Sequence, residues 1–102
     1  MVKKVGEHIT LDIIGTKKEY SPSFYEKLVY KIAKKAKVTV LDISKHKFEP
    51  QGFTLVALLA ESHISFHTFP ERGIISFDFF TCGKVSPLVA LDILKKEIDH
   101  KR

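Results

Sequence analysis

The stretch FTLVALLAESHISFHTFPERGIISFDFFTCG, residues 53–83, contains the three most strand-like segments of the chain. Residues 53–60 are apolar nearly throughout, which favours a central strand that is covered on both faces. Residues 62–69 and 74–81 alternate apolar and polar side chains, which is typical of strands with one solvated face. Proline and glycine in the intervening residues 70–73 indicate a tight turn. The stretch therefore predicts three consecutive antiparallel strands.

The segments on either side of this stretch complete the pattern of a mixed fold. Residues 8–15 and 37–44 are each interpreted as a strand. The dipeptide SP at 21–22 predicts the start of a helix, in which apolar residues recur at i+4 spacing. The same dipeptide opens a second amphipathic helix, expected over 86–101. The order β-α-β-β-β-β-α predicts an α+β two-layer sandwich, a mainly antiparallel sheet with two helices packed on one face.

Length and composition limit the class of protein. With 102 residues, the chain is expected to form a single domain, and it has neither an apolar run of membrane-spanning length nor a signal-peptide core. We therefore expect a soluble, cytoplasmic protein with no membrane partner. The formal charge of +5 permits nucleic-acid binding, but the lysines lie on the expected solvent faces of the helices, so no nucleic-acid partner is expected.

The single cysteine, Cys82, excludes an intramolecular disulfide framework and a metal site built from thiolates. No metal is therefore expected. Cys82 itself is either a buried residue without a chemical role, which is the commoner case, or a reactive thiol.

Glu61 and Ser62 interrupt the apolar run abruptly, in the middle of the most strand-like part of the chain. One interpretation is simple alternation, in which the polar residues of 62–69 form an exposed strand face. Another is a break in the chain path, through which His67 could approach the Glu61–Ser62 bond. Cys82 ends the neighbouring strand, where functional side chains commonly collect.

The segments AESHISFHTFPE (60–71) and FDFFTCG (77–83) resemble the prokaryotic S-adenosylmethionine decarboxylases, which are small pyruvoyl-dependent enzymes of polyamine (spermidine) biosynthesis. The resemblance extends from GEHITLDI (6–13) to the second helix, and both the order and the spacing of the segments match. It implies a lyase that decarboxylates S-adenosylmethionine and supplies aminopropyl groups for polyamine synthesis.

The resemblance further implies that the chain is a proenzyme that cleaves itself at the Glu61–Ser62 bond. The Ser62 hydroxyl would attack the carbonyl carbon of Glu61, and β-elimination of the resulting ester would follow. The products would be a β chain, residues 1–61, and an α chain, residues 62–102, which begins with a pyruvoyl group derived from Ser62. This cofactor would bind the substrate amine as a Schiff base and accept electrons during decarboxylation.

Three further catalytic roles follow from the same resemblance. His67 corresponds to the base of the elimination step, which suits an imidazole because its pKa lies near working pH. Thr54 stands where the family usually has a processing serine, and it retains the hydroxyl. Cys82 occupies the position of the proton donor in decarboxylation.

The resemblance also implies a binding site for the substrate. Phe48 and Phe69 stand where the family stacks aromatic rings on the adenine, although position 69 is more often tryptophan. Glu71 stands where a carboxylate holds the ribose hydroxyls, and Ile64 would add an apolar contact. A homodimer is expected, with each active site using residues from both protomers. Family members usually continue into a further strand after the second helix, so this sequence is either a minimal form or lacks a strand that borders the sheet, which would leave an edge in need of cover.

Two alternatives remain open. A pyruvoyl-dependent decarboxylase of arginine or of another amino acid could use the same scaffold, although Glu71 and Phe48 favour a nucleoside substrate. A non-enzymatic basic domain that binds nucleic acid would leave Ser62, His67 and Cys82 without a role.

Overall fold

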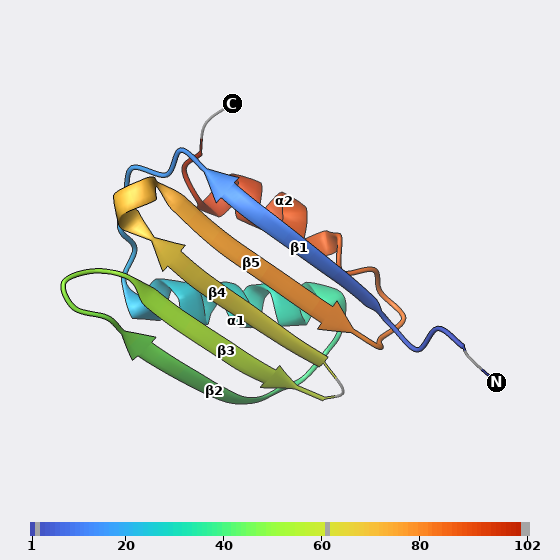
Figure 1. Cartoon of the computed structure of the whole chain (residues 1–102). Coiled ribbons are helices and arrows are strands. Elements are labelled where there is room, and N and C mark those ends of the chain that lie inside the picture. The colour runs from blue at the N-terminus through green and yellow to red at the C-terminus, as the bar shows by residue number, and fades with distance from the viewer. Residues whose placement is uncertain (2, 61, 101–102) are drawn as a thin grey trace.

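The computed structural model describes residues 1, 3–60 and 62–100 of the chain. Five antiparallel strands form one sheet in the order β1-β5-β4-β3-β2, and both helices lie on the same face of it (Figure 1). This arrangement confirms the α+β sandwich and the predicted element order. The elements are β1 (Glu7–Ile14), α1 (Pro22–Ala36), β2 (Val40–Lys47), β3 (Phe53–Leu59), β4 (Ser62–Phe69), a 3-10 turn (Pro70–Arg72), β5 (Ile74–Thr81) and α2 (Val89–Glu97).

The core lies between the sheet and the helices. Strand β4 contributes Ile64 and Phe66, and strand β5 contributes Phe77 and Phe79, all of them fully or almost fully buried. They pack against the apolar side of α1, where Tyr25 contacts Phe66 with a ring-centroid distance of 5.3 Å. Because side chains alternate along a strand, the residues between them point to the opposite face of the sheet, which no described helix covers.

We call the uncovered side of the sheet the open face. Its residues form rows across the sheet, because the strands are in regular register. His67 of β4 lies opposite Thr54 of β3, and Ser65 of β4 lies opposite Asp78 of β5. The open face carries the odd-numbered residues of β4, including His67.

Strand β3 is not covered on both faces within one chain, contrary to the prediction from its apolar sequence. Val56 and Leu58 lie on the open face and are 42% and 54% exposed. The apolar run predicted burial from composition alone, and the covering layer is missing from the single chain. Strands β1 and β2 form the edges of the sheet, as far as the described residues go.

Two elements differ from prediction in their bounds: β2 runs to Lys47 rather than residue 44 and α2 ends at Glu97 rather than residue 101, and both begin later than predicted for local reasons. Strand β2 begins at Val40 rather than residue 37, because Lys37 adopts the left-handed conformation (φ 58°) that ends α1. Helix α2 begins at Val89 rather than at residue 86. The Ser86 hydroxyl accepts a hydrogen bond from the amide of Leu88, which holds a tight turn before the helix. None of the helices within the described residues is long and apolar enough to cross a membrane.

Candidate active site

A cavity of about 280 Å³ lies at the C-terminal end of β4, beside the 3-10 turn. It gathers five of the residues that the sequence predicts to be functional, although they come from four separate segments of the chain. The lining residues are Phe48, Gln51, Gly52, Thr54, His67, Thr68, Phe69 and Glu71. We call the predicted members of this set, Phe48, Thr54, His67, Phe69 and Glu71, the histidine end of the site.

Within the histidine end, His67 and Thr54 are hydrogen-bonded across the β3–β4 pair. The Thr54 hydroxyl lies 3.1 Å from Nδ1 of His67, and the two residues are direct partners in the strand register. The threonine can therefore fix the orientation of the imidazole of this exposed histidine. A histidine held in this way is suited to remove or deliver a proton.

Two half-exposed aromatic rings and a carboxylate complete the histidine end. Phe48 contacts His46 edge-on at a centroid distance of 4.5 Å, and the guanidinium of Arg72 lies 5.9 Å from the ring centroid of Phe69. Glu71 is exposed in the 3-10 turn between the strands. Flat apolar surfaces next to a hydrogen-bond acceptor can hold a planar base and the hydroxyls of a sugar.

Sequence reasoning missed three residues that line this cavity, Gln51, Gly52 and Thr68. Gly52 adopts a positive φ of 104° and its carbonyl accepts a hydrogen bond of 2.8 Å from the amide of Phe48, which closes the loop that carries the aromatic ring. The glycine signals a turn in the sequence, but not its role in the cavity. Gln51 lines the cavity beside it, and nothing in its sequence context indicated this.

Ser62 and Cys82 meet at the opposite end of β4, which we call the serine end. The amide of Cys82 donates to the Ser62 hydroxyl oxygen at 3.4 Å. Ser62 is 7% exposed, whereas Cys82 is exposed, so the interpretation of this cysteine as a buried residue is wrong. It follows β5 directly and therefore sits outside the sheet. Glu61, the predicted other half of the cleavage site, lies outside the described residues.

The structure separates His67 from Ser62 within one chain. Strand β4 is continuous from Ser62 to Phe69, so there is no break in its path over these residues that would bring the imidazole back to the serine. Five residues of extended strand span roughly 16 Å. The odd and even positions also point to opposite faces, with His67 on the open face. The expectation that His67 approaches the Glu61–Ser62 bond is therefore wrong for a single chain.

Ile64 does not contribute to either end of the site. Its side chain is fully buried among the core residues that face the helices. The prediction that Ile64 offers an apolar contact to a substrate is not met in this structure, because its place on the strand turns it away from the open face.

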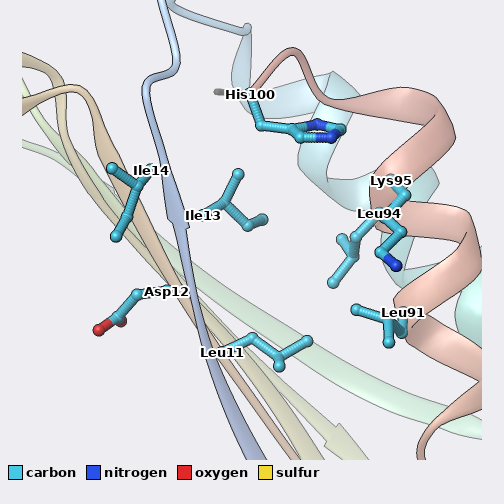
Figure 2. A pocket seen from close by; sticks show the side chains of 8 residues that line it. All are labelled: Leu11, Asp12, Ile13, Ile14, Leu91, Leu94, Lys95 and His100. Atoms are coloured by element: carbon cyan, nitrogen blue, oxygen red, sulfur yellow. The ribbon is translucent and has the colours of Figure 1, made fainter. Parts of the chain in front are cut away.

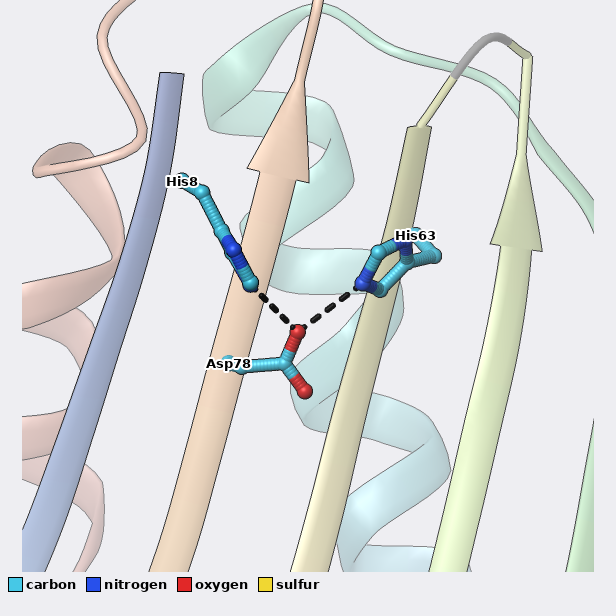
Figure 3. A group of neighbouring side chains, drawn as sticks. All are labelled: His8, His63 and Asp78. Atoms are coloured by element: carbon cyan, nitrogen blue, oxygen red, sulfur yellow. Dashed lines mark hydrogen bonds and ion pairs between the residues drawn. The ribbon is translucent and has the colours of Figure 1, made fainter.

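A third polar group, His8, His63 and Asp78, lies on the open face near the serine end (Figure 3). Nε2 of His8 and Nε2 of His63 lie 2.8 Å and 2.9 Å from the same oxygen, Oδ1 of Asp78, and Ser65 donates to Oδ2. Burial by itself would raise the pKa of Asp78, but the hydrogen bonds from Ser65, His8 and His63 outweigh it and hold this pKa below its ordinary value. The Asp78 carboxylate is therefore ionised at neutral pH.

Another cavity, of about 310 Å³, lies between β1 and α2 (Figure 2). Its walls are mainly aliphatic, from Leu11 and Ile13 on the strand and Leu91 and Leu94 on the helix. It contains none of the residues predicted to be catalytic or substrate-binding, so the polar ends of β4 remain the candidate active site.

Comparison with known proteins identifies relatives that match most of the chain. The family model described as S-adenosylmethionine decarboxylase matches residues 7–102. An S-adenosylmethionine decarboxylase proenzyme from Prochlorococcus marinus is 41% identical over 100 residues, which cover 95% of this chain and 80% of the relative. The proenzyme of the same name from Methanococcus vannielii is 44% identical over 85 residues, covering 81% and 70%.

A solved structure is similar over nearly the whole fold. The crystal structure of the adenosylmethionine decarboxylase from Aquifex aeolicus superimposes with a TM-score of 0.83 at 35% sequence identity, covering 99% of this chain and 86% of that one. The family match spans both the histidine end and the serine end of the site. The chain therefore belongs to the S-adenosylmethionine decarboxylase family.

Proposed function

We propose that this chain decarboxylates S-adenosylmethionine for polyamine biosynthesis, using a pyruvoyl group that it makes from Ser62. The observation that carries the proposal is the histidine end, where Phe48, Phe69 and Glu71 border one cavity with the hydrogen-bonded pair of His67 and Thr54. The aromatic rings suit an adenine and the carboxylate suits the hydroxyls of a ribose. Both features match the substrate named for the relatives.

The serine end fits the making of a pyruvoyl group. Ser62 starts β4 directly after the short connection from β3, and its hydroxyl oxygen accepts a hydrogen bond from the Cys82 amide. Attack of this oxygen on the preceding carbonyl carbon forms an ester and frees the Ser62 amine. Loss of the Ser62 Cα proton then expels the backbone carboxylate of Glu61, which becomes the C-terminus of the β chain. The dehydroalanine left behind is an enamine, and its hydrolysis releases ammonia. The resulting ketone would supply an electrophile that no ordinary side chain offers.

A homodimer would unite the two ends of the site. We infer that two copies pack open face against open face, since this face exposes Val56, Leu58 and Ile14 on a sheet that the chain's own helices cover only on the other side. A two-fold axis that runs between the sheets and across the strands would stack each β4 antiparallel to its counterpart. The serine end of one protomer would then face the histidine end of its partner.

Such a dimer would form two complete sites, each from the serine end of one chain and the histidine end of the other, although the two ends lie far apart within a single chain. The partner's His67 would act on the backbone Cα proton of Ser62, since the Ser62 side chain itself belongs to the helix side of the strand, and the reverse would hold at the second site. Cys82 would stay beside the pyruvoyl group in its own chain, because the Cys82 amide already contacts Ser62. A cytoplasmic location stays a prediction from the sequence.

The substrate is tested by measuring the release of labelled carbon dioxide from carboxyl-labelled S-adenosylmethionine and, in parallel, from labelled arginine. We expect release from S-adenosylmethionine alone, because arginine has neither an adenine ring to stack on Phe48 nor a ribose whose hydroxyls could bond to Glu71. Release from arginine alone would assign the scaffold to an amino-acid decarboxylase. The absence of release from both, in a protein cleaved at Ser62, would contradict the proposed activity.

Replacement of the exposed thiol separates cleavage from turnover. Cys82→Ala should still yield two fragments, because the amide that contacts Ser62 belongs to the backbone and is retained. Decarboxylation should slow by about 10²- to 10⁴-fold, the usual effect of losing a general acid. Intact mass spectrometry and initial rates of carbon dioxide release measure the two steps. A cleaved variant with the rate of the unmodified enzyme would exclude Cys82 as the proton donor.

A further inference from the structure

The group His8, His63 and Asp78 has no role in the proposed chemistry, yet its polar atoms converge. The three side chains come from β1, β4 and β5, which are neighbours in the order β1-β5-β4, and all three point toward one spot on the open face (Figure 3). Their ligand-type atoms lie within 4.8 Å of one another. Strands hold such groups more rigidly than loops do.

We propose that His8, His63 and Asp78 form a binding site for a divalent transition metal ion, zinc above all. Two imidazole nitrogens and one carboxylate oxygen are a common protein ligand set for zinc, with the fourth position open to solvent. The lone cysteine excludes thiolate ligation only, so the expectation of no metal, which rested on thiolates, does not extend to this group.

Two of the three ligand distances are compatible with ligation after a small adjustment, and the third, between the two imidazole nitrogens, is within 4.8 Å. A tetrahedral zinc site keeps its ligand atoms about 3.3 Å apart. The two contacts between imidazole Nε2 and Oδ1 of Asp78, at 2.8 Å and 2.9 Å, would widen by about 0.5 Å to reach this value. Each neutral imidazole would carry its proton on Nδ1, so that the Nε2 lone pair faces the ion.

Neighbouring side chains already hold the ligands in place. Phe80 of β5 is the direct strand partner of both His8 and His63. Its ring lies edge-on to the imidazole of His8 and is stacked on that of His63, with a centroid distance of 6.0 Å in each case. Ser65 donates to Oδ2 of Asp78 and leaves Oδ1 directed at the imidazoles. Such outer contacts orient metal ligands and strengthen binding. In the single chain the side chains of His8 and His63 are 47% and 43% exposed, so an ion can enter from solvent before the proposed dimer covers the open face.

The same contacts could also serve as a hydrogen-bond network without a metal, and direct binding measurements separate the two cases. The full-length chain is freed of metal with a chelator and titrated with cobalt(II), which gives intense visible absorption when it is four-coordinate. Zinc is then added in competition. We expect one equivalent of cobalt to produce this spectrum and zinc to abolish it.

Variants identify the site. His8→Ala and Asp78→Asn should lose the four-coordinate spectrum, and Ser65→Ala should weaken zinc binding by about 10- to 100-fold, because Ser65 orients the carboxylate. His46→Ala removes an exposed histidine elsewhere on the sheet and should bind like the unmodified chain. Both His8 and His46 are exposed, so neither replacement disturbs the core.

Two results would overturn the proposal. One is the absence of a four-coordinate spectrum in the unmodified chain. The other is an equal loss of affinity in His46→Ala and His8→Ala, which would indicate binding by scattered surface histidines. The measurement needs no catalytic activity, so its outcome is independent of whether the chain decarboxylates S-adenosylmethionine.

Discussion

Ser62→Ala should remain a single uncleaved chain of 11.6 kDa, whereas the unmodified protein should separate into two fragments under denaturing conditions. The hydroxyl is the only group of Ser62 that can attack the preceding carbonyl, and the alanine variant has no atom to replace it. Intact mass spectrometry after prolonged incubation measures the result. We also expect the larger fragment to end at residue 61, and the smaller one to carry a carbonyl that reacts with hydroxylamine.

The matched control is Ser65→Ala, the same chemical change three residues further along β4. Both serines are almost buried, at 7% and 5% exposure, but only Ser62 borders the proposed cleavage site. Ser65→Ala should therefore yield two fragments. The appearance of two fragments from Ser62→Ala would show that cleavage does not need this hydroxyl, and would overturn the pyruvoyl proposal.

Complementation between two inactive variants should restore cleavage if the site is shared between protomers. His67→Ala alone should process on the order of 10²- to 10⁴-fold more slowly, because it lacks the base for elimination. When it is co-expressed with Ser62→Ala, the heterodimer contains one site with an intact Ser62 from the first chain and an intact His67 from the second. The His67→Ala chains within such heterodimers should be cleaved, while the Ser62→Ala chains stay whole.

Different affinity tags on the two variants allow the heterodimers to be isolated before mass analysis. The control pairs His67→Ala with a Ser62→Ala/His67→Ala double variant, in which no functional combination exists, and cleavage should stay slow. Uncleaved His67→Ala in purified heterodimers would contradict a base supplied by the partner. Failure to recover any heterodimer would contradict the face-to-face dimer itself.

The features that the sequence predicted correctly depend on local interactions. Strands β4 and β5 are defined by the alternation over residues 62–69 and 74–81 and by the turn-forming residues between them. Ser21 caps α1, as its sequence context indicates. The structure brings Phe48, Phe69 and Glu71 to one cavity, and the expectation that they share a site came from resemblance to a family, since they lie in separate segments.

The features that the sequence did not predict depend on distant parts of the chain. His8 lies 70 residues from Asp78, and only the pairing of β1 with β5 brings them together. The separation of His67 from Ser62 follows from the unbroken path of β4, whereas the polar residues at its start suggested a break. Exposure of Val56 and Leu58 could not be read from an apolar run, because burial depends on layers that a single chain does not supply.

The strand order determines what self-cleavage would do to the molecule. Residues 1–61 provide β1 at one edge and β2 and β3 at the other, while residues 62–102 provide β4 and β5 between them. The shorter fragment would be clamped on both sides by the longer one through two complete strand ladders, β1·β5 and β3·β4. The nicked protein would stay assembled without a covalent link. Once unfolded, however, its two pieces would have to find each other by diffusion, so refolding would become a bimolecular reaction.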